Sequence, residues 1–354
     1  MPVDTRTDTH DDLLAPAGSG ATAMTAPLVD RWGRIHRSLR ISVTDACNIR
    51  CRYCMPAHPA PFLPVQRLLS FELIERLVRA VVPMGVTRLR LTGGEPLLRP
   101  HLADLVARLC RVDGVEDIAL TTNGILLADQ LPALVEAGLR RVNISLDTLE
   151  ESVFQRLSRR AGLDRVLRGI DAAVGYPGLE VKLNALVLRD VNLEGVVDLV
   201  EFALPRGIPL RFIEFMPLDG DGCWSRQQVV YGAELRRRIA EKFGQLQAVS
   251  RPDPARPAVE YRVAGFEATL GFIDTVSQPF CDTCDRLRLT ADGRLRNCLF
   301  GKEEWDVATP LQRGAADDEI RQRVRACIAA KHQAHGINQQ NFTPPHRAMY
   351  QIGG

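Results

Sequence analysis

Between about residue 39 and residue 215, short apolar runs alternate with longer segments whose apolar residues recur every three or four positions. Short runs rich in β-branched residues are typical of buried strands, whereas the longer spacing is typical of helices with one buried face. The predicted strands cover residues 39–43, 88–92, 118–121, 142–146, 181–187 and 210–215. The predicted helices between them cover residues 71–82, 102–110, 131–137, 163–174 and 193–202.

This alternation predicts an α/β fold built from six consecutive βα units. Such units form either an open doubly wound sheet or an incomplete barrel, and both place ligands at the carboxyl ends of the strands. After about residue 245 the pattern changes, because a proline-rich, charged stretch at 251–257 precedes shorter strand-like runs. We therefore predict a domain boundary near residue 245.

Composition narrows the class of protein without identifying it. Hydrophobic residues make up 45% of the 354 positions and charged residues 25%, which is ordinary globular composition and excludes a disordered or membrane-embedded chain as a whole. The net charge of +2 does not favour general nucleic-acid binding. Residues 1–30 contain five Asp and one Arg and lack the basic and apolar regions of a secretory signal. We expect a flexible leader at 1–30 in a cytoplasmic protein with no membrane anchor.

The nine cysteines are unevenly distributed. An odd number without an export signal argues against a disulfide framework. Six of them form two groups: the first triad is Cys47, Cys51 and Cys54, and the second triad is Cys281, Cys284 and Cys298. This clustering predicts two metal centres. The remaining three, Cys110, Cys223 and Cys327, have no neighbour at ligand spacing.

The first triad directly follows the first predicted strand. Three soft thiolates can hold three corners of an iron–sulfur cluster and leave one iron open to a substrate or cofactor. The alternative is a zinc knuckle with His58 as the fourth ligand, although zinc sites favour paired C-x2–4-C spacing.

Two further features accompany this triad: Tyr53 immediately before its third cysteine, and Gly93-Gly94-Glu95-Pro96 at the end of the second predicted strand. The combination resembles the signature of radical S-adenosylmethionine enzymes. The resemblance implies an incomplete (βα)6 barrel of the TIM type, with a [4Fe–4S] cluster whose open iron binds S-adenosylmethionine. It also implies four contacts with that cofactor: Tyr53, Gly94, Ser145 and Met216.

Shortly after the first two cysteines of the second triad come two arginines at alternate positions, Arg286 and Arg288. Alternate positions on a strand point to the same side, so both could clamp a phosphate or a carboxylate. The spacing by itself also fits a structural zinc site.

The chain ends in Gly353-Gly354, which is also typical of ubiquitin-like modifiers, but those are far smaller and carry no cluster motif. Two further segments, Leu120-Thr-Thr-Asn-Gly124 and Arg211-Phe-Ile-Glu-Phe-Met216, accompany the two triads. Together these features resemble the GTP 3′,8-cyclase family of molybdenum-cofactor biosynthesis, over the chain from about residue 31 onward. The resemblance implies a barrel core at 31–245 and a C-terminal extension at 246–354 with a second [4Fe–4S] cluster. It implies catalytic roles for Gly353, Gly354, Arg286 and Arg288, with the tail inserted in the active site. The implied GTP contacts are Arg40, Arg90, Thr121, Lys182, Arg211, Arg286, Leu287 and Arg288.

The reaction implied by this resemblance begins with a 5′-deoxyadenosyl radical made from S-adenosylmethionine. That radical abstracts the 3′ hydrogen of GTP, and C3′ then bonds to C8, which gives 3′,8-cyclo-7,8-dihydro-GTP, the first intermediate of molybdopterin synthesis. The implied partners are an electron donor of the flavodoxin or ferredoxin type, the downstream cyclic pyranopterin monophosphate synthase, and a second copy of the chain in a homodimer. Two alternatives stay open: another radical enzyme with an auxiliary cluster, such as a peptide-modifying maturase, and a zinc-stabilised binding module.

Several polar residues outside these motifs have competing interpretations. Arg88 lies two positions before Arg90, so we expect it to face the same side and add to the phosphate clamp, with surface ion pairing as the alternative. His332 and His335 could form a metal pair, but surface polarity is the expectation. The acidic residues Asp147, Glu150 and Glu151 could act as general acids or bases, but we expect them to start a helix.

Overall fold

The computed structural model describes residues 25–58, 62–251 and 253–353. Six parallel strands form the centre of the fold: β1 Ser38–Ser42, β2 Arg88–Thr92, β3 Asp117–Thr122, β4 Arg141–Ser145, β5 Glu180–Val187 and β6 Leu210–Glu214. The helices that connect them are α2 Phe71–Val81, α3 Leu102–Cys110, α4 Leu127–Glu136, α5 Glu151–Ser158, α6 Leu163–Val174 and α7 Val196–Ala203. All six predicted strands are confirmed to within a residue at each end.

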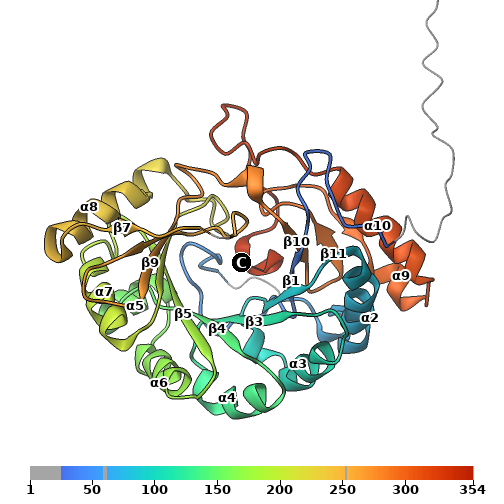
Figure 1. The fold of residues 1–354 in the computed structure, drawn as a ribbon, viewed down its shortest axis with the longest axis horizontal. Coiled ribbons are helices and arrows are strands. Elements are labelled where there is room, and N and C mark those ends of the chain that lie inside the picture. Colours follow the sequence, from blue (N-terminus) through green and yellow to red (C-terminus); the bar gives the residue numbers. More distant parts are fainter. Residues whose placement is uncertain (1–24, 59–61, 252, 354) are drawn as a thin grey trace, which may run out of the picture.

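The six strands are neighbours in chain order, each parallel to the next. A doubly wound sheet would reverse its strand order partway, so this order selects the incomplete barrel. Figure 1 shows the strands curving around a central space with the helices on the outside. Strand residues alternate accordingly: Leu39 and Ile41 are fully buried under the helices, whereas Arg40 between them faces the centre.

The residues after β6 extend both edges of this sheet. Helix α8 (Gly232–Phe243) leads to β7 (Gln247–Ala248), β8 (Val259–Arg262) and β9 (Thr269–Ile273), and β9 lies parallel to β6. The chain then crosses to the other edge, where β10 (Arg286–Leu289) lies parallel to β1, followed by the antiparallel strands β11 (Arg294–Arg296) and β12 (Trp305–Asp306). The predicted boundary near residue 245 thus falls within one continuous sheet.

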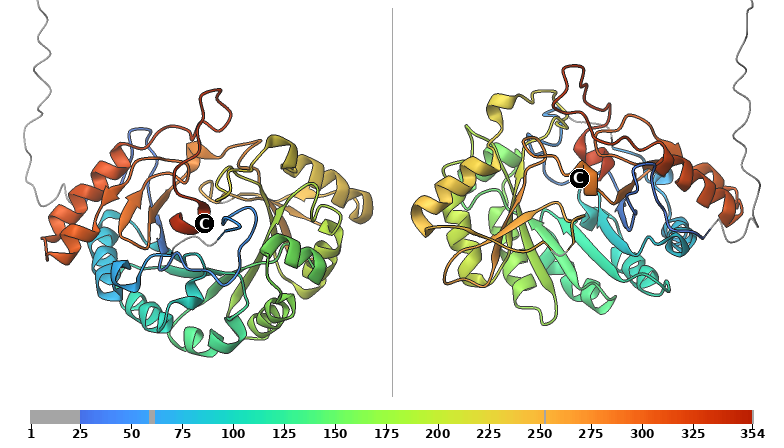
Figure 2. Two further views of the ribbon diagram at one scale, coloured as in Figure 1. Left: turned by 180° about the vertical axis from the view of Figure 1, so that it is seen from behind. Right: turned by 45° about the horizontal axis from the view of Figure 1, so that its top comes forward.

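Three helices complete the described chain: α9 Ala308–Gln312, α10 Asp317–Ala329 and α11 Met349–Ile352. Helices α9 and α10 pack against α2, whereas α11 lies in the middle of the ring, as both views in Figure 2 show. At the other terminus, residues 1–24 of the predicted leader lie outside the described residues, but Leu28 and Asp30 are buried. The packed chain therefore starts earlier than residue 31.

Differences from the predicted helices are local. Helix α4 starts at Leu127, one turn earlier than predicted, and accommodates Pro132 in its interior. Helix α7 starts three residues later than predicted. No helix among the described residues combines the length and the apolar composition that a membrane span requires.

The turn after β2 lies directly on the loop that follows β1. The N–H of Gly94 donates to the Thr44 carbonyl at 2.8 Å, and the N–H of Glu95 donates to the Ala46 carbonyl at 2.8 Å. A Cβ on Gly94 would lie 2.4 Å from the Ala46 oxygen. The buried Glu95 carboxylate accepts hydrogen bonds from the Thr122 hydroxyl at the end of β3 and from the N–H of Asn123, which follows it. Gly94 and Glu95 therefore fix the position of the loop that carries the first triad.

Replacing Gly94 by alanine should destabilise the protein by about 1–3 kcal/mol, because the added methyl group overlaps backbone carbonyls that cannot rotate away. Chemical denaturation of the metal-free protein measures this change. Gly195→Ala is the matched control, since a Cβ there meets only one atom at 3.8 Å. Equal stability of the two variants would contradict the close approach.

Candidate active site

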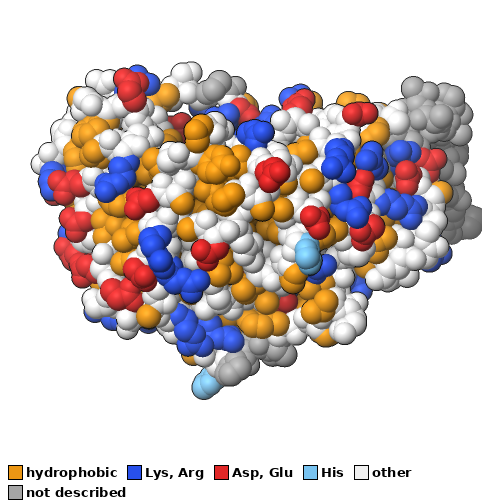
Figure 3. Space-filling view, turned by 90° about the horizontal axis from the view of Figure 1, so that it is seen from below, with side chains coloured by type: hydrophobic (Ala, Val, Ile, Leu, Met, Phe, Trp, Pro, Cys, Tyr) orange, Lys and Arg blue, Asp and Glu red, His pale blue; other side chains and the backbone are white. Residues whose placement is uncertain are grey.

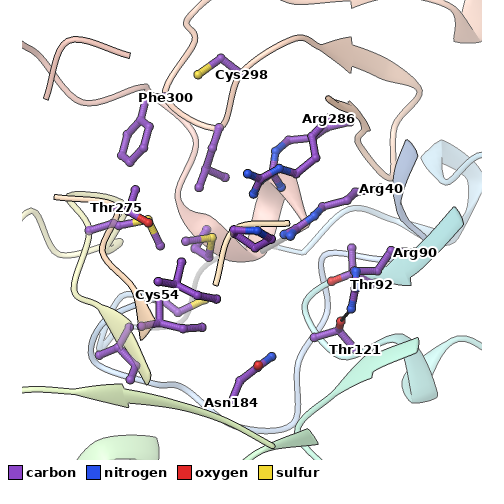
Figure 4. A pocket seen from close by; sticks show the side chains of 18 of the residues that line it. Arg40, Cys54, Arg90, Thr92, Thr121, Asn184, Thr275, Arg286, Cys298 and Phe300 are labelled. Carbon is purple, nitrogen blue, oxygen red and sulfur yellow. Dashed lines mark hydrogen bonds between the residues drawn. The ribbon is translucent and has the colours of Figure 1, made fainter. Parts of the chain in front are cut away.

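A cavity of about 390 Å³ lies inside the barrel and brings all six clustered cysteines together. The first triad follows the carboxyl end of β1, as expected for a ligand loop. The second triad does not lie at the carboxyl ends: Cys281 and Cys284 precede the amino end of β10, and Cys298 follows β11. In Figure 4, Cys54 and Cys298 lie on opposite sides of the same cavity.

The thiols of the first triad lie on a tight turn in which the N–H groups of Cys54 and Met55 both donate to the Cys51 carbonyl at 2.9 Å. All three are free thiols and face the cavity. Burial raises the pKa of Cys47 to about 12 and also raises the pKa values of Cys51 and Cys54. Buried thiolates of this kind are stabilised by bound metal ions, so the donor set fits an iron–sulfur cluster.

The second triad has a more basic environment. Lys331 donates to the Arg286 carbonyl at 3.0 Å and lies 3.6 Å from the Cys284 sulfur. Burial raises the pKa of Cys284, but the positive charges of Arg286 and Lys331 outweigh it and bring this pKa to about 6. Three thiols beside two fixed cations fit a second anionic cluster.

Neither triad has the geometry of a single-metal site. Among the described residues, no three His, Cys, Asp or Glu side chains lie close enough to hold one metal ion. A zinc knuckle needs all its ligands on one ion, whereas in a cubane cluster each thiolate binds its own iron. Thiols that do not converge on one ion are compatible with clusters.

Four arginines face the cavity from three adjacent strands. The β-sheet register aligns Arg288, Arg40 and Arg90 in one row across β10, β1 and β2. Figure 4 shows Arg40, Arg90 and Arg286 converging from one side. No described carboxylate forms an ion pair with any of the four, and Nε and Nη2 of Arg286 are buried without a hydrogen-bond partner. This part of the cavity therefore carries positive charge that a bound anion would neutralise.

Burial and repulsion between neighbouring arginines both lower the pKa values of Arg90 and Arg288 in this row. Desolvation, with the neighbouring Arg286, lowers the pKa of Arg288 to about 9, and desolvation with the nearby Arg141 and Arg211 lowers that of Arg90 to about 10. By contrast, the outer face in Figure 3 mixes positive and negative side chains. The net charge of +2 for the whole chain therefore does not reflect the concentration of arginines in the cavity.

All four residues predicted to contact S-adenosylmethionine line the cavity: Tyr53, Gly94, Ser145 and Met216. The Tyr53 hydroxyl donates to the Asp147 carboxylate at 2.5 Å, and the other carboxylate oxygen accepts from the N–H of Leu186 at 2.8 Å. The prediction that Asp147 starts a helix is therefore wrong. Helix α5 begins at Glu151, and its preceding residue makes no side-chain cap. Asp147 instead faces the cavity, and burial raises its pKa to about 6.

The predicted GTP contacts divide into two groups. Arg40, Arg90, Thr121, Arg211, Arg286 and Arg288 line the cavity. Lys182 is not among its lining residues and instead pairs with Glu180 at 2.5 Å. The Leu287 side chain is fully buried in the hydrophobic core on the outer face of β10, so only its main chain could reach a ligand.

Two further predictions are corrected. Arg88 does not join the arginine row: it pairs with Asp253 at 2.6 Å and is not among the residues that line the cavity. His332 and His335 both line the cavity rather than lying only on the surface, and the His335 ring lies 4.6 Å from the ring of Phe300. They do not form part of a described metal-binding group.

The C-terminal tail enters the cavity through α11. The Gly353 carbonyl accepts a buried hydrogen bond from Arg288 Nη1 at 2.8 Å. Gly353 has a φ of +69°, and a Cβ there would lie 2.8 Å from a Thr92 side-chain atom, so only glycine fits. Gly354 lies outside the described residues. Four asparagines that were not among the predicted site residues also line the cavity: Asn123, Asn143, Asn184 and Asn297. Asn123 lies in the segment 120–124 and Asn297 directly precedes Cys298, whereas no motif marks the other two.

Comparison with known proteins agrees with this geometry. Residues 41–203 match the Radical SAM superfamily, and residues 208–337 match the family described as Molybdenum Cofactor Synthesis C. A protein named GTP 3',8-cyclase from Rhodopirellula baltica is 49% identical, covering 94% of each chain. A protein of the same name from Corynebacterium glutamicum is 44% identical over 98% of this chain and 93% of its own.

Solved structures share the fold at low sequence identity. Streptococcus suis SuiB bound to S-adenosylmethionine gives a TM-score of 0.53 at 14% identity, covering 82% of this chain and 65% of its own. SuiB bound to its precursor peptide SuiA gives 0.55 at 15% identity, covering 86% and 69%. These likenesses support the barrel alone, whereas the sequence relatives extend over nearly the whole chain. The protein therefore belongs to the GTP 3′,8-cyclase family of the radical S-adenosylmethionine superfamily.

Proposed function

We propose that this protein is a GTP 3′,8-cyclase that converts GTP to 3′,8-cyclo-7,8-dihydro-GTP in molybdenum-cofactor biosynthesis. The observation that carries the proposal is that one cavity is lined by both cysteine triads and by four arginines that pair with no carboxylate among the described residues, and that Gly353 of the tail accepts a hydrogen bond from one of these arginines. A zinc-binding module would not need a basic cavity between its two cysteine groups. The names of the sequence relatives support the same activity.

The first triad and its neighbours would hold a [4Fe–4S] cluster and S-adenosylmethionine. When bound, this pair supplies a 5′-deoxyadenosyl radical after one-electron reduction. Tyr53 and Gly94 would orient the cofactor beside the thiols, and Ser145 and Met216 would contact it from the ends of β4 and β6. Met216 packs with Ile352 of the tail in a small hydrophobic cluster, which would exclude water from the reacting groups.

The arginine row would hold the triphosphate of GTP. Guanidinium groups bind phosphate oxygens in pairs, and their burial in a low-dielectric cavity strengthens that attraction. The second triad would hold another [4Fe–4S] cluster near the guanine end of the substrate. Neither Lys182 nor Leu287 lines the cavity. Their contacts with GTP are therefore predictions from the family resemblance alone, and this proposal does not depend on them. The proposal requires an external electron donor of the flavodoxin or ferredoxin type and a downstream cyclic pyranopterin monophosphate synthase.

The direct test is anaerobic reconstitution with iron and sulfide, followed by incubation with dithionite, S-adenosylmethionine and GTP. Mass spectrometry then follows 5′-deoxyadenosine and a cyclised nucleotide. We expect about eight irons per chain and a product that forms only with GTP. Cleavage without a GTP product would overturn the substrate but keep the radical chemistry, and zinc without cleavage would indicate a binding module.

Replacing Cys51 by alanine should abolish cleavage of S-adenosylmethionine, because a cluster held by two thiolates loses its fixed position. About half of the iron should remain, bound by the second triad. The control is Cys223→Ala, which removes an exposed thiol outside the cavity and should leave iron content and cleavage unchanged. Normal cleavage by the Cys51→Ala protein would refute the assignment of the first triad.

Replacing Arg288 by glutamine should weaken GTP binding at least about tenfold, equivalent to about 1.4 kcal/mol, because one buried cation of the row is lost. Cleavage of S-adenosylmethionine without GTP should continue. Equilibrium binding of GTP under anaerobic conditions measures the first effect, with Arg88→Gln as the control since Arg88 lies outside the cavity. Equal GTP affinities for these two variants would count against the phosphate role of the row.

A further inference from the structure

The N-terminal hairpin before β1 lies outside both matched family regions, which cover residues 41–203 and 208–337. It is held by the pairing of Val29 with Ile35 and by a bond from the N–H of His36 to the Leu28 carbonyl at 2.8 Å. From this hairpin, the side chain of Arg34 extends to the cavity wall beside the second triad. This contact links the start of the chain to residues almost 250 positions later.

The guanidinium of Arg34 connects two separate segments of the second triad's surroundings. Its Nη1 donates to the Cys281 carbonyl at 2.7 Å and to the Gln333 carbonyl at 2.9 Å, and its Nη2 donates to the His332 carbonyl at 2.8 Å. One buried side chain therefore ties the turn that carries Cys281 to the segment that follows α10.

Asp30 fixes the orientation of this guanidinium. Its carboxylate accepts a bond from Arg34 Nε at 2.6 Å, and it also accepts from the N–H groups of Trp32 and Arg34. The same carboxylate lies 3.1 Å from Nε2 of the fully buried His36. Because the carboxylate balances the charge of Arg34, the arginine contributes fixed hydrogen bonds to the second triad more than it contributes net charge.

We propose that Arg34 is a positioning residue for the second iron–sulfur cluster, an inference that rests on the proposed function. Without its guanidinium, three carbonyls lose their donor, and the Cys281 turn loses its connection to residues 332 and 333. Groups that orient metal ligands have to hold them within a few tenths of an ångström, and their loss weakens metal binding without removing a ligand. The N-terminal hairpin is thus part of the second cluster site.

The test measures iron at each triad separately in the full-length protein. One parent has the first triad replaced by alanine and the other has the second triad replaced by alanine. Arg34→Gln and Arg34→Lys are introduced into both, and all proteins are reconstituted anaerobically. Iron per chain, the electron paramagnetic resonance spectrum of the reduced cluster, and the melting temperature of the metal-free protein are recorded.

We expect both substitutions to lower iron at the second triad at least about twofold and to alter the spectrum of its cluster, while iron at the first triad is unchanged. Lysine keeps the charge but cannot reach three carbonyls, so its failure to rescue distinguishes geometry from charge. Arg189→Gln is the matched control, because Arg189 also bonds one carboxylate and two carbonyls, but away from both triads.

Three outcomes would overturn the inference. Unchanged iron and an unchanged spectrum at the second triad would show that Arg34 positions nothing. A parallel loss of iron at both triads, with a melting temperature lower than that of Arg189→Gln, would reduce its role to general folding. If the parent that retains only the second triad binds no iron, the second cluster of the proposed function fails, and this inference fails with it.

Discussion

The parallel pairing of β10 with β1 is the constraint on which the site depends. It places Arg288 beside Arg40, and the pairing of β1 with β2 then places Arg40 beside Arg90. The chain reaches β10 by crossing from the opposite edge of the sheet, and Cys281 and Cys284 lie at the end of that crossing. They line the same cavity as the first triad, which follows the carboxyl end of β1. A slip of one residue in this register would turn both Arg286 and Arg288 toward the hydrophobic core.

Because the arginine row has no carboxylate partner among the described residues, its burial is electrostatically unfavourable until an anion binds. Burying a cation without a counter-charge is costly, and the neighbouring arginines repel one another, which is why the pKa values of Arg90 and Arg288 are lowered. The Gly353 carbonyl supplies one dipole to Arg288 but no charge. The barrel therefore holds positive charge that no carboxylate among the described residues pairs with, which favours a polyanionic ligand. Its rigid strands keep that charge in place without a conformational change.

Much of this could be predicted from the sequence because the relevant signals are local. Strands were recognisable from short β-branched runs, and both triads from cysteine spacing. The features that were missed depend on which side chains meet in the folded chain. Asp147 occupies a sequence typical of a helix start, but its carboxylate is bound by Tyr53, 94 residues earlier. Lys182 has the correct strand and side for a phosphate contact, but Glu180 on the same strand is close enough to pair with it.

The same distinction explains why the role of Arg34 is invisible in the sequence. Its partners are backbone carbonyls, and any residue type can supply a carbonyl, so no motif at positions 281, 332 or 333 records the contact. The thiols of the second triad can be identified by their spacing, but the spacing does not determine how far apart they lie in the folded chain. That distance depends on the segments that hold the Cys281 turn, and one of them comes from before β1. The N-terminal hairpin therefore contributes to the active site although it supplies neither a cysteine nor a predicted contact with either ligand.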